Sequence, residues 1–365
     1  MATQSIPMAP PATERPGPIG WMRRHLFATP FDTVLTLLVV AILALLIPPL
    51  FRWAVLNANL TATNRTECPV DGACWALIPS RFHQYLFGLY PVDQYWRVIL
   101  GGILLLVGCI PLFVTNFPRK ALYGLCFAIL YPIVAAWLFA GGGPLQPTVD
   151  TNLWGGLFLT LVISIVGIVA SFPIGIVLAL GRRSNMPVVK ALCVSFIELV
   201  RGVPLITVLF MAMLLVPLLN PGLASVENVF RAIVGFTLFS AAYLAENVRG
   251  GLQSVPFGQE EAGRALGLSG WQVIVLITLP QALRAVIPAL VGQCIALFKD
   301  TSLVVLVGLT DLTGMSKGVI SQAEYVGLQT EVYVFISIMY FVFSYAMAFV
   351  SRRIEASGSG KARRL

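Results

Sequence analysis

The residues of this chain that could do chemistry are charged side chains within or beside long apolar segments. The ones to consider are Glu198, Arg201, Glu246, Lys299 and Asp300. Charged groups in apolar surroundings are costly, so they usually face a cavity or a partner charge. Each could be a structural ion pair or a helix-end charge whose stem lies along apolar surface. Together they could also bind a small zwitterion, which requires both a cation and an anion opposite it.

Two short patterns stand out among these groups. Glu198 and Arg201 are three residues apart, a spacing at which they could pair along one helix face. The second pattern is the consecutive run Lys299, Asp300, Thr301 and Ser302. Its two hydroxyl groups could add hydrogen bonds to a charged ligand. We hypothesise that this run lines a translocation path near the outer half of a helical bundle.

The sequence lacks the side-chain sets that catalysis or metal binding would need. The histidines are His25 and His83, and neither has a carboxylate or a cysteine at metal-ligand spacing, so no metal site is indicated. Both precede the later apolar segments, which argues against Ser-His-Asp or Cys-His catalysis. The Gly-x-x-x-x-Gly-Lys-Ser/Thr loop that cradles nucleotide phosphates is also missing. We therefore expect no enzymatic activity and no cofactor in this chain.

Residues 258–269 are the most informative segment, because their pattern predicts a short helix of about three turns with defined ends. Pro256 suits a helix start. Glu260 and Glu261 complement the positive end of the helix dipole in the first turn. Gly267 can adopt the left-handed conformation that ends a helix.

The same helix is predicted to carry a narrow docking face. Ala262, Ala265 and Leu266 follow the i, i+3, i+4 spacing, so these small apolar residues share one side of the helix. Ser269 and Gln272 form a capping-box pair that starts the next helix at once and fixes the angle between the two. A rigid helix held at a set angle could transmit force from a partner protein. An ordinary helical hairpin connection is the alternative.

The composition identifies the elements that must position these residues as membrane-spanning helices. Of 365 residues, 58% are apolar and only 11% are charged, and the mean hydropathy is +0.86. A soluble domain carries about 25% charged residues, so a soluble enzyme, a disordered chain and a disulfide-stapled secreted module are excluded. The net charge of +8 does not indicate nucleic-acid binding. Basic residues collect on the cytoplasmic loops of membrane proteins, and this accounts for the excess.

A membrane-spanning helix needs about 20 apolar residues. The runs without charged residues are 33–51, 98–118, 121–149, 151–181, 202–226, 232–245, 265–283, 285–298 and 332–351. Two of them flank Arg284 and read as one long or bent helix, which leaves about eight spans. The runs are continuously apolar, which excludes an outer-membrane β-barrel. The sequence therefore predicts an all-α, polytopic helical bundle.

The distribution of Lys and Arg among the short loops predicts that both termini are cytoplasmic. The chain divides near Asp150, because glycine, proline and charged residues recur at the ends of the later spans. The predicted parts are a disordered cytoplasmic tail (1–30), an extension with about three spans (31–150) and an external loop (52–97), a core (151–355) with the short helix (255–270), and a basic tail (356–365). The aromatic residues of the external loop would suit the membrane interface.

The cysteines fall into two groups. Four lie within apolar runs, where a small buried side chain is the default interpretation. Cys68 and Cys74 lie in the external loop, so a disulfide between them is possible if that compartment is oxidising. Spacing alone does not decide whether this disulfide forms.

Several segments resemble the permease subunits of bacterial ATP-binding-cassette (ABC) importers. Residues 261–263 with Gly267, LPQALR (279–284) and PAL (288–290) resemble the EAA loop of those subunits, with Gly263 where the triplet has its last alanine. The segments that are similar to the polar-amino-acid branch of the family are ELVRGVPL (198–205), AYLAENVRGG (242–251), KDTSL (299–303), WGGL (154–157), TL (160–161) and LGRRS (180–184). They cover about residues 151–355.

This resemblance implies a type I importer core of about five helices, in which part of the EAA loop contacts an ATPase. The residues assigned to coupling are Glu261, Ala262, Gly263, Leu266 and Gly267. The family also implies the partners: a second permease subunit, two ATPase subunits that bind ATP and Mg, and a periplasmic protein that delivers the amino acid. Location in the bacterial inner membrane and transport by alternating access follow from the same resemblance.

Shorter segments in the first half are similar to one subtype of this family. The matching residues are CWA (74–76), RF (81–82), GLYP (88–91) and WR (96–97). They look like the longer of two permease subunits in importers of general L-amino acids or of glutamate, glutamine, aspartate and asparagine, which implies a heterodimer. Two alternatives remain. An ion-coupled secondary transporter would show a repeat of broken helices and more intramembrane carboxylates. A membrane-embedded enzyme would need a catalytic cluster inside the spans.

Overall fold

The computed structural model describes residues 17–62, 65–114, 117–143, 146–220, 222 and 225–362. Throughout these ranges the regular elements are helices, and the only β-structure is a set of isolated bridges. Contacts divide the chain into two compact units, Met1–Ala76 and Leu77–Leu365.

The first unit consists of one long apolar helix followed by a compact loop. Its helices are α1 (Pro18–His25), α2 (Pro30–Phe51), the π-helix η1 (Arg52–Leu56) and the 3-10 turn η2 (Arg65–Glu67). A capping box starts α2, since the Thr29 side chain accepts from the backbone of Asp32 and the Asp32 carboxylate accepts from the backbone of Thr29. Because α2 is apolar on all sides and 22 residues long, it has the length and composition of a membrane span.

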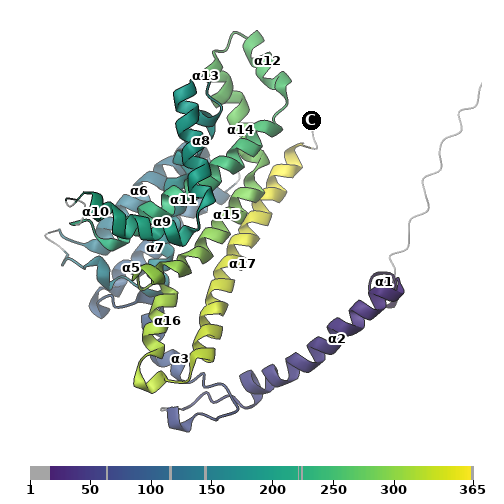
Figure 1. The fold of residues 1–365 in the computed structure, drawn as a ribbon, viewed down its shortest axis with the longest axis vertical. Helices are drawn as coiled ribbons and strands as arrows, with labels where there is room; N and C mark the ends of the chain where they lie inside the picture. The colour runs from purple at the N-terminus through teal and green to yellow at the C-terminus, as the bar shows by residue number, and fades with distance from the viewer. Residues whose placement is uncertain are drawn as a thin grey trace, which may run out of the picture. The chain divides into compact units, whose positions relative to one another are not determined.

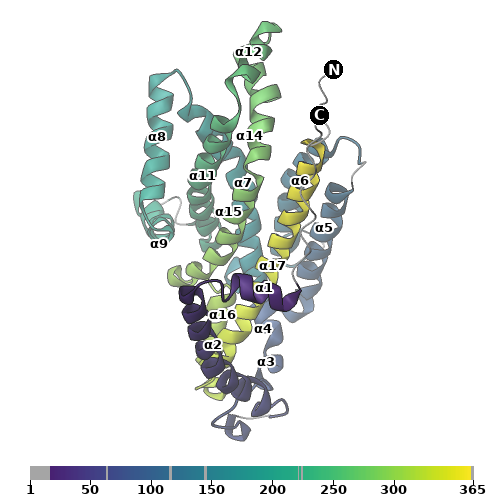
Figure 2. The same cartoon turned by 90° about the vertical axis from the view of Figure 1, so that its right-hand side faces the viewer.

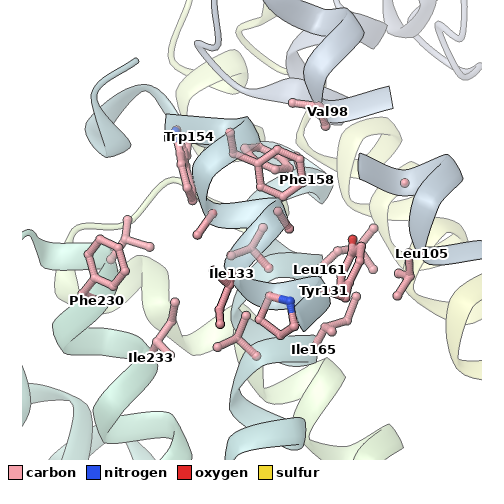
Figure 3. Close-up of a pocket in the computed structure, with 18 residues that line it drawn as sticks. Val98, Leu105, Tyr131, Ile133, Trp154, Phe158, Leu161, Ile165, Phe230 and Ile233 are labelled. Carbon is pink, nitrogen blue, oxygen red and sulfur yellow. The ribbon is translucent and has the colours of Figure 1, made fainter. Parts of the chain in front are cut away.

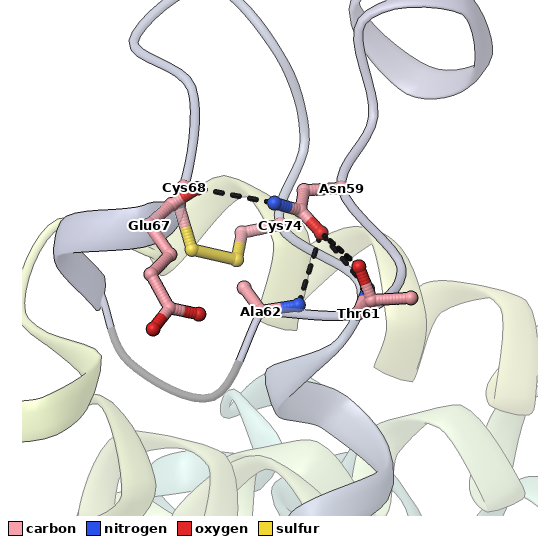
Figure 4. Close-up of a disulfide and its surroundings, with 6 residues drawn as sticks. All are labelled: Asn59, Thr61, Ala62, Glu67, Cys68 and Cys74. Atoms are coloured by element: carbon pink, nitrogen blue, oxygen red, sulfur yellow. Dashed lines mark hydrogen bonds between the residues drawn. A yellow bond between two sulfur atoms is a disulfide. The ribbon is translucent and has the colours of Figure 1, made fainter.

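The loop after η1 is held together by a disulfide and an asparagine. The structure joins Cys68 and Cys74 in a disulfide (Figure 4). The Asn59 side-chain oxygen accepts from the backbone N–H groups of Thr61 and Ala62, and its amide nitrogen donates to the carbonyl of Glu67 (Figure 4). These bonds satisfy backbone groups that regular secondary structure would otherwise pair.

The second unit contains the remaining helices. They are α3 (Leu77–Ser80), α4 (Phe82–Phe87), η3 (Val92–Gln94), α5 (Tyr95–Phe113), α6 (Lys120–Ala140), η4 (Thr151–Leu153), α7 (Gly156–Arg182), α8 (Pro187–Gly202), α9 (Leu205–Phe210), η5 (Met211–Leu215), α10 (Val216–Leu219), α11 (Asn228–Ser254), α12 (Phe257–Ala265), α13 (Gly270–Val273), η7 (Ile274–Thr278), α14 (Leu279–Ala285), α15 (Ile287–Asp300), η8 (Thr301–Val307), α16 (Leu312–Ile320), η9 (Ala323–Tyr325) and α17 (Gln329–Ala362). In Figures 1 and 2, α12 lies at one end of this unit, and α3 and α16 lie at the opposite end.

The number of spans confirms the predicted polytopic bundle. Among the residues that the structure describes, seven helices are long and apolar enough to cross a membrane, or up to eight if a bent pair counts as one span. The bent pair is α8 with the segment from Leu205 to Leu214, and the bend between them is 110°. The sequence predicted a connection before Gly202 and a span after it, whereas the structure has a helix on both sides of the bend.

The bend follows from its residues. Gly202 ends α8, and Val203 adopts an extended conformation with φ −117° and ψ 149°. A residue before proline is disfavoured in the helical region, and Pro204 has no N–H to continue the helix. A second interruption at Val286, two residues before Pro288, separates α14 from α15. The single bent helix expected around Arg284 is therefore several shorter helices.

Helices α7 and α11 pack along each other at the centre of the second unit. Glycines allow this close approach: a Cβ at Gly175 would lie 2.6 Å from Leu244, and one at Gly167 would lie 3.2 Å from Phe236. Small residues at helix contacts are the usual means of packing helices in membranes, where no hydrophobic effect drives association.

At the end of the unit opposite α12, a buried aspartate caps α16. The Asp311 carboxylate accepts from the backbone N–H groups of Thr313 and Gly314, and it also accepts from the Tyr340 hydroxyl at 3.1 Å. Burial away from water disfavours the charged form and raises the pKa of the Asp311 carboxyl to about 6.

Candidate functional site

The predicted short helix is present as α12, with the ends that the sequence indicated. Pro256 is the N-cap residue. At the other end Gly267 is left-handed with φ +80°, its N–H donates to the carbonyl of Arg264, and the N–H of Leu268 donates to the carbonyl of Gly263. These two bonds form a Schellman cap. The capping box between Ser269 and Gln272 then starts α13.

The residues assigned to coupling divide between two sides of α12. Glu261, Ala262 and Gly267 are exposed, and Leu266 is 81% exposed. Gly263 is buried instead, because it faces the following helix. A Cβ at Gly263 would lie 2.7 Å from the Ile277 side chain of η7. Four of the five residues are therefore available to a partner, whereas Gly263 lets α12 lie close against the bundle.

Two polar contacts also attach α12 to the bundle. Glu260 forms an ion pair with Arg183, the C-cap residue of α7, at 3.0 Å, and the Glu260 side chain is only 15% exposed. The Gln281 amide of α14 donates to the Gln259 side chain at 3.3 Å. These two contacts connect α12 to both α7 and α14.

A cluster of charged residues lies where the ends of α7, α8 and α11 meet, and we call it the ionic cluster. It consists of Arg182, Glu198, Arg201, Glu246 and Arg249. The Arg249 guanidinium donates to both carboxylate oxygens of Glu246. Arg182 lies 3.5 Å and Arg201 lies 3.8 Å from Glu246, and Arg182 also pairs with Glu198 at 2.8 Å.

The pairing within the ionic cluster differs from the expected one. Among the ion pairs of the described residues, Glu198 pairs with Arg182 and Arg201 pairs with Glu246, whereas Glu198 and Arg201 do not pair with each other. The guanidinium of Arg201 also lies over the ring of Tyr243, 5.5 Å from its centre. The cluster therefore connects the consecutive helices α7 and α8 to α11, and its three cations outnumber its two carboxylates.

Residues 299–302 lie at the junction of α15 and η8 and do not share one environment. Lys299 is exposed, and Asp300 and Ser302 are half-buried. Thr301 is fully buried, and its hydroxyl donates to the carbonyl of Phe298 at 2.6 Å. Three of the four side chains can therefore reach a solute without rearrangement, and Thr301 cannot.

Some residues of these sites were not singled out from the sequence. They are Arg182, Arg183 and Arg249, which lie within segments that resemble the permease family. Arg249 follows Glu246 by three residues, which is a helical pairing distance and could have indicated this contact. The contact between Glu260 and Arg183 joins positions 77 residues apart, and no local pattern signals it.

Comparisons with known proteins show the family to which this chain is similar. Residues 171–357 match the family described as binding-protein-dependent transport system inner membrane component. The inner membrane amino-acid ABC transporter permease protein YhdY of Escherichia coli (strain K12) is 46% identical over 92% of this chain and 91% of its own. The glutamate/glutamine/aspartate/asparagine transport system permease protein BztC of Rhodobacter capsulatus is 37% identical over 97% of this chain and 96% of its own. A solved crystal structure of an amino acid ABC transporter with histidines is 28% identical, covers 57% of this chain and 92% of its own, and has a TM-score of 0.49.

Membership of this family sets aside both an ion-coupled secondary transporter and a membrane-embedded enzyme. The two relatives match along nearly their whole lengths, so the match includes the extension as well as the core. The chain belongs to the binding-protein-dependent transport system inner membrane components and is a permease subunit of an amino-acid ABC importer.

Proposed function

We propose that α12 is the element through which a separate ATPase drives this permease. The observation that carries the proposal is that α12 combines an exposed surface with a firm attachment. Leu266 is 81% exposed, whereas Glu260 and Gly263 hold the helix on the bundle. A partner that moves Leu266 must therefore move the helices behind it, which is the requirement for transmitting force.

The proposed assembly contains two ATPase subunits, which bind ATP and Mg and hydrolyse ATP. It also contains a second, homologous permease subunit and a periplasmic protein that delivers the substrate. We place the chain in the bacterial inner membrane with both termini cytoplasmic, which puts α12 on the side where ATP is available. The basic residues of the loops on that side support this orientation. The name of the Escherichia coli relative supports the same membrane.

The two parts of the chain that the sequence predicts have different proposed roles. Residues 31–150 are the extension, and residues 151–355 are the core that moves during transport. We propose that the substrates include polar amino acids such as those for which the Rhodobacter capsulatus relative is named.

We propose that the translocation path passes the junction of α15 and η8. Lys299 and Asp300 supply one charge of each sign at this junction, as a zwitterion requires, and Ser302 adds a hydroxyl group. Thr301 would support the path through its bond to the backbone rather than by contact with the solute. The ionic cluster would hold the ends of α7, α8 and α11 together in one state of alternating access and release them in the other.

The proposal is tested by reconstituting the complete transporter in proteoliposomes and measuring ATP-dependent, vanadate-sensitive uptake of labelled acidic, neutral and basic amino acids. Alanine at Lys299, Asp300 or Ser302 should reduce uptake at least tenfold, a loss of about 1.4 kcal/mol of binding or transition-state stabilisation. Alanine at Lys317, an exposed lysine of α16, is the matched control and should keep wild-type uptake.

Two results would contradict the proposal. If the alanine variants of Lys299 and Asp300 transport as well as the wild type, the path does not pass these residues. If the purified chain transports amino acids without any ATPase, coupling through α12 is wrong.

A further inference from the structure

Helix α7 has its charged contacts at one end. Its only charged residue is Arg182, the last residue of the helix, and Arg183 follows as the C-cap. The first half of α7, from Phe158 to Val166, lines an apolar pocket together with α5, α6 and α11 (Figure 3). In the ion pairs of the described residues, α7 and its C-cap therefore take part only through these two arginines.

The two neighbouring arginines contact different parts of the bundle. Arg183 pairs with Glu260 of α12 at 3.0 Å. Arg182 pairs with Glu198 of α8 at 2.8 Å and with Glu246 of α11 at 3.5 Å. Successive residues of a helix point about 100° apart, so the last turn of α7 can contact α12 on one side and the ionic cluster on another.

The pair of Arg183 and Glu260 is the one ion pair of α12 in the part of the chain that the structure describes. The backbone of α12 packs on α13 and η7, the two elements that follow it. The contact of Gln259 with Gln281 also returns to this segment of the chain, because α14 follows η7 directly. Glu260 therefore supplies the ionic connection from α12 to a helix that lies earlier in the chain.

The surroundings of Glu260 favour this connection. Its side chain is shielded from water, whereas the side chains of its neighbour Glu261 and of Arg183 are exposed. Shielding reduces the screening of charges by water and salt, so this pair is stronger than one between two fully exposed side chains. Arg182 is half-buried where it contacts the ionic cluster, and the same reasoning applies there.

We propose that Arg182 and Arg183 transmit the displacement of α12 to the ionic cluster and are positioning residues for alternating access. The inference rests on the function proposed above for α12. Coupling between distant sites can be carried by networks of ion pairs that have two arrangements. When the ATPase moves α12, Glu260 moves Arg183. Because Arg182 is shared between Glu198 and Glu246, its movement changes how α8 is held against α11.

A competing route for the same displacement is the close packing of α12 on η7. Gly263 lies against the Ile277 side chain there, and this route needs no charge. Glu260→Gln separates the two routes, because it removes the charge and nearly keeps the shape of the side chain. Leu266, the exposed residue that we propose for contact with the ATPase, is unchanged in this variant.

The experiment uses the complete transporter in proteoliposomes and measures ATP hydrolysis and amino-acid uptake in the same samples. The number of amino acids taken up per ATP hydrolysed reports the coupling. Loss of folded protein lowers both rates together, so a merely structural effect leaves this ratio unchanged. In E260Q the ratio should fall at least about fivefold, the lower end of typical coupling between sites. The Kd for the ATPase should stay within about twofold of the wild-type value.

Further variants test the charge and the order of the contacts. R183Q should lower the ratio as E260Q does, and R183K, which keeps the charge, should retain most of it. R182Q should also lower the ratio. The double variant E260Q/R182Q should lose no more than the worse of the two single variants, because both changes break the same connection. K190Q is the matched control and should keep the wild-type ratio, since Lys190 is exposed on α8 and has no ion pair among the described residues.

Three results would overturn the inference. The ratio of E260Q could equal that of the wild type, or the losses of E260Q and R182Q could multiply in the double variant. E260Q could also bind the ATPase more weakly, and Glu260 would then contact the ATPase instead of transmitting movement. The role of α12 is tested separately by Leu266→Ala. If Leu266→Ala lowers uptake and E260Q keeps the wild-type ratio, only the route through the arginines is wrong; if neither variant changes uptake, the proposed function is wrong as well.

Discussion

The substitution Leu266→Ala tests whether the exposed end of α12 enters a groove of the ATPase. The Leu266 side chain is 81% exposed in the structure, so the free permease gains almost nothing from it. Burying a leucine side chain completely contributes about 1.5 to 3 kcal/mol. We scale this burial free energy by the exposed fraction and allow for the methyl group that alanine retains. The expected loss of binding free energy is then about 1 to 2 kcal/mol. The ATPase should therefore bind the variant about five- to thirtyfold more weakly.

The assay titrates labelled ATPase subunits onto the reconstituted permease and measures the Kd, together with ATP-driven uptake. Thermal unfolding of the permease should change little, because substitutions at exposed positions usually alter stability by less than about 0.5 kcal/mol. Val188→Ala is the matched control, since Val188 is 69% exposed but belongs to α8. The reasoning is refuted if Leu266→Ala binds the ATPase within about twofold of the wild type, or if Val188→Ala weakens binding equally.

Substitutions in three other parts of the structure test the contacts described above. Gly263→Ala should keep uptake near the wild-type level, because the alanine methyl group meets mainly the flexible tip of the Ile277 side chain and the helix gains about 1 kcal/mol of propensity. Gly263→Phe should abolish uptake, and an active Phe variant would contradict the close packing of α12 against η7. Glu246→Gln should lower the free energy of unfolding by about 2 to 3 kcal/mol, as measured by denaturation in detergent. In the double variant with Arg249→Gln, the decrease in the free energy of unfolding should be smaller than the sum of the two single decreases. Strictly additive decreases would argue against the ion pair. The raised pKa of Asp311 means that the folded protein binds the proton of this carboxyl group more tightly than the unfolded chain does. The group therefore stabilises the fold below about pH 4, and up to about 3 kcal/mol of this stabilisation is lost as the pH rises through 6. Asp311→Asn should remove this pH dependence, and identical pH–stability curves for the two proteins would exclude it.

The ends of α12 could be predicted from the sequence because they depend on local interactions. Pro256, the left-handed Gly267 and the capping box at Ser269 each act within a few residues, and all occur as expected. The amphipathic pattern also indicated a face for docking. It could not tell which residues face the partner and which face the bundle, so the inward orientation of Gly263 required the structure.

Other features depend on contacts between distant segments and were not predictable in this way. The bend at Val203 had a local signal in the following proline, but the long apolar run after Gly202 favoured a straight span beginning there. The pairing of Glu246 with Arg182 depends on how α7 packs against α11. Nothing in the spacing of residues 299–302 indicated that Thr301 is buried.

The turn at Val203 and Pro204 also constrains where water can be. It interrupts the ladder of backbone hydrogen bonds between α8 and α9, so carbonyl groups at the end of one helix and amide groups at the start of the next have no helical partners. Lipid tails cannot hydrate such groups, and irregular backbone within a bilayer must therefore lie against other protein or a wetted cavity. The turn at Val203 and Pro204 consequently cannot lie on the lipid-facing surface of the assembled transporter.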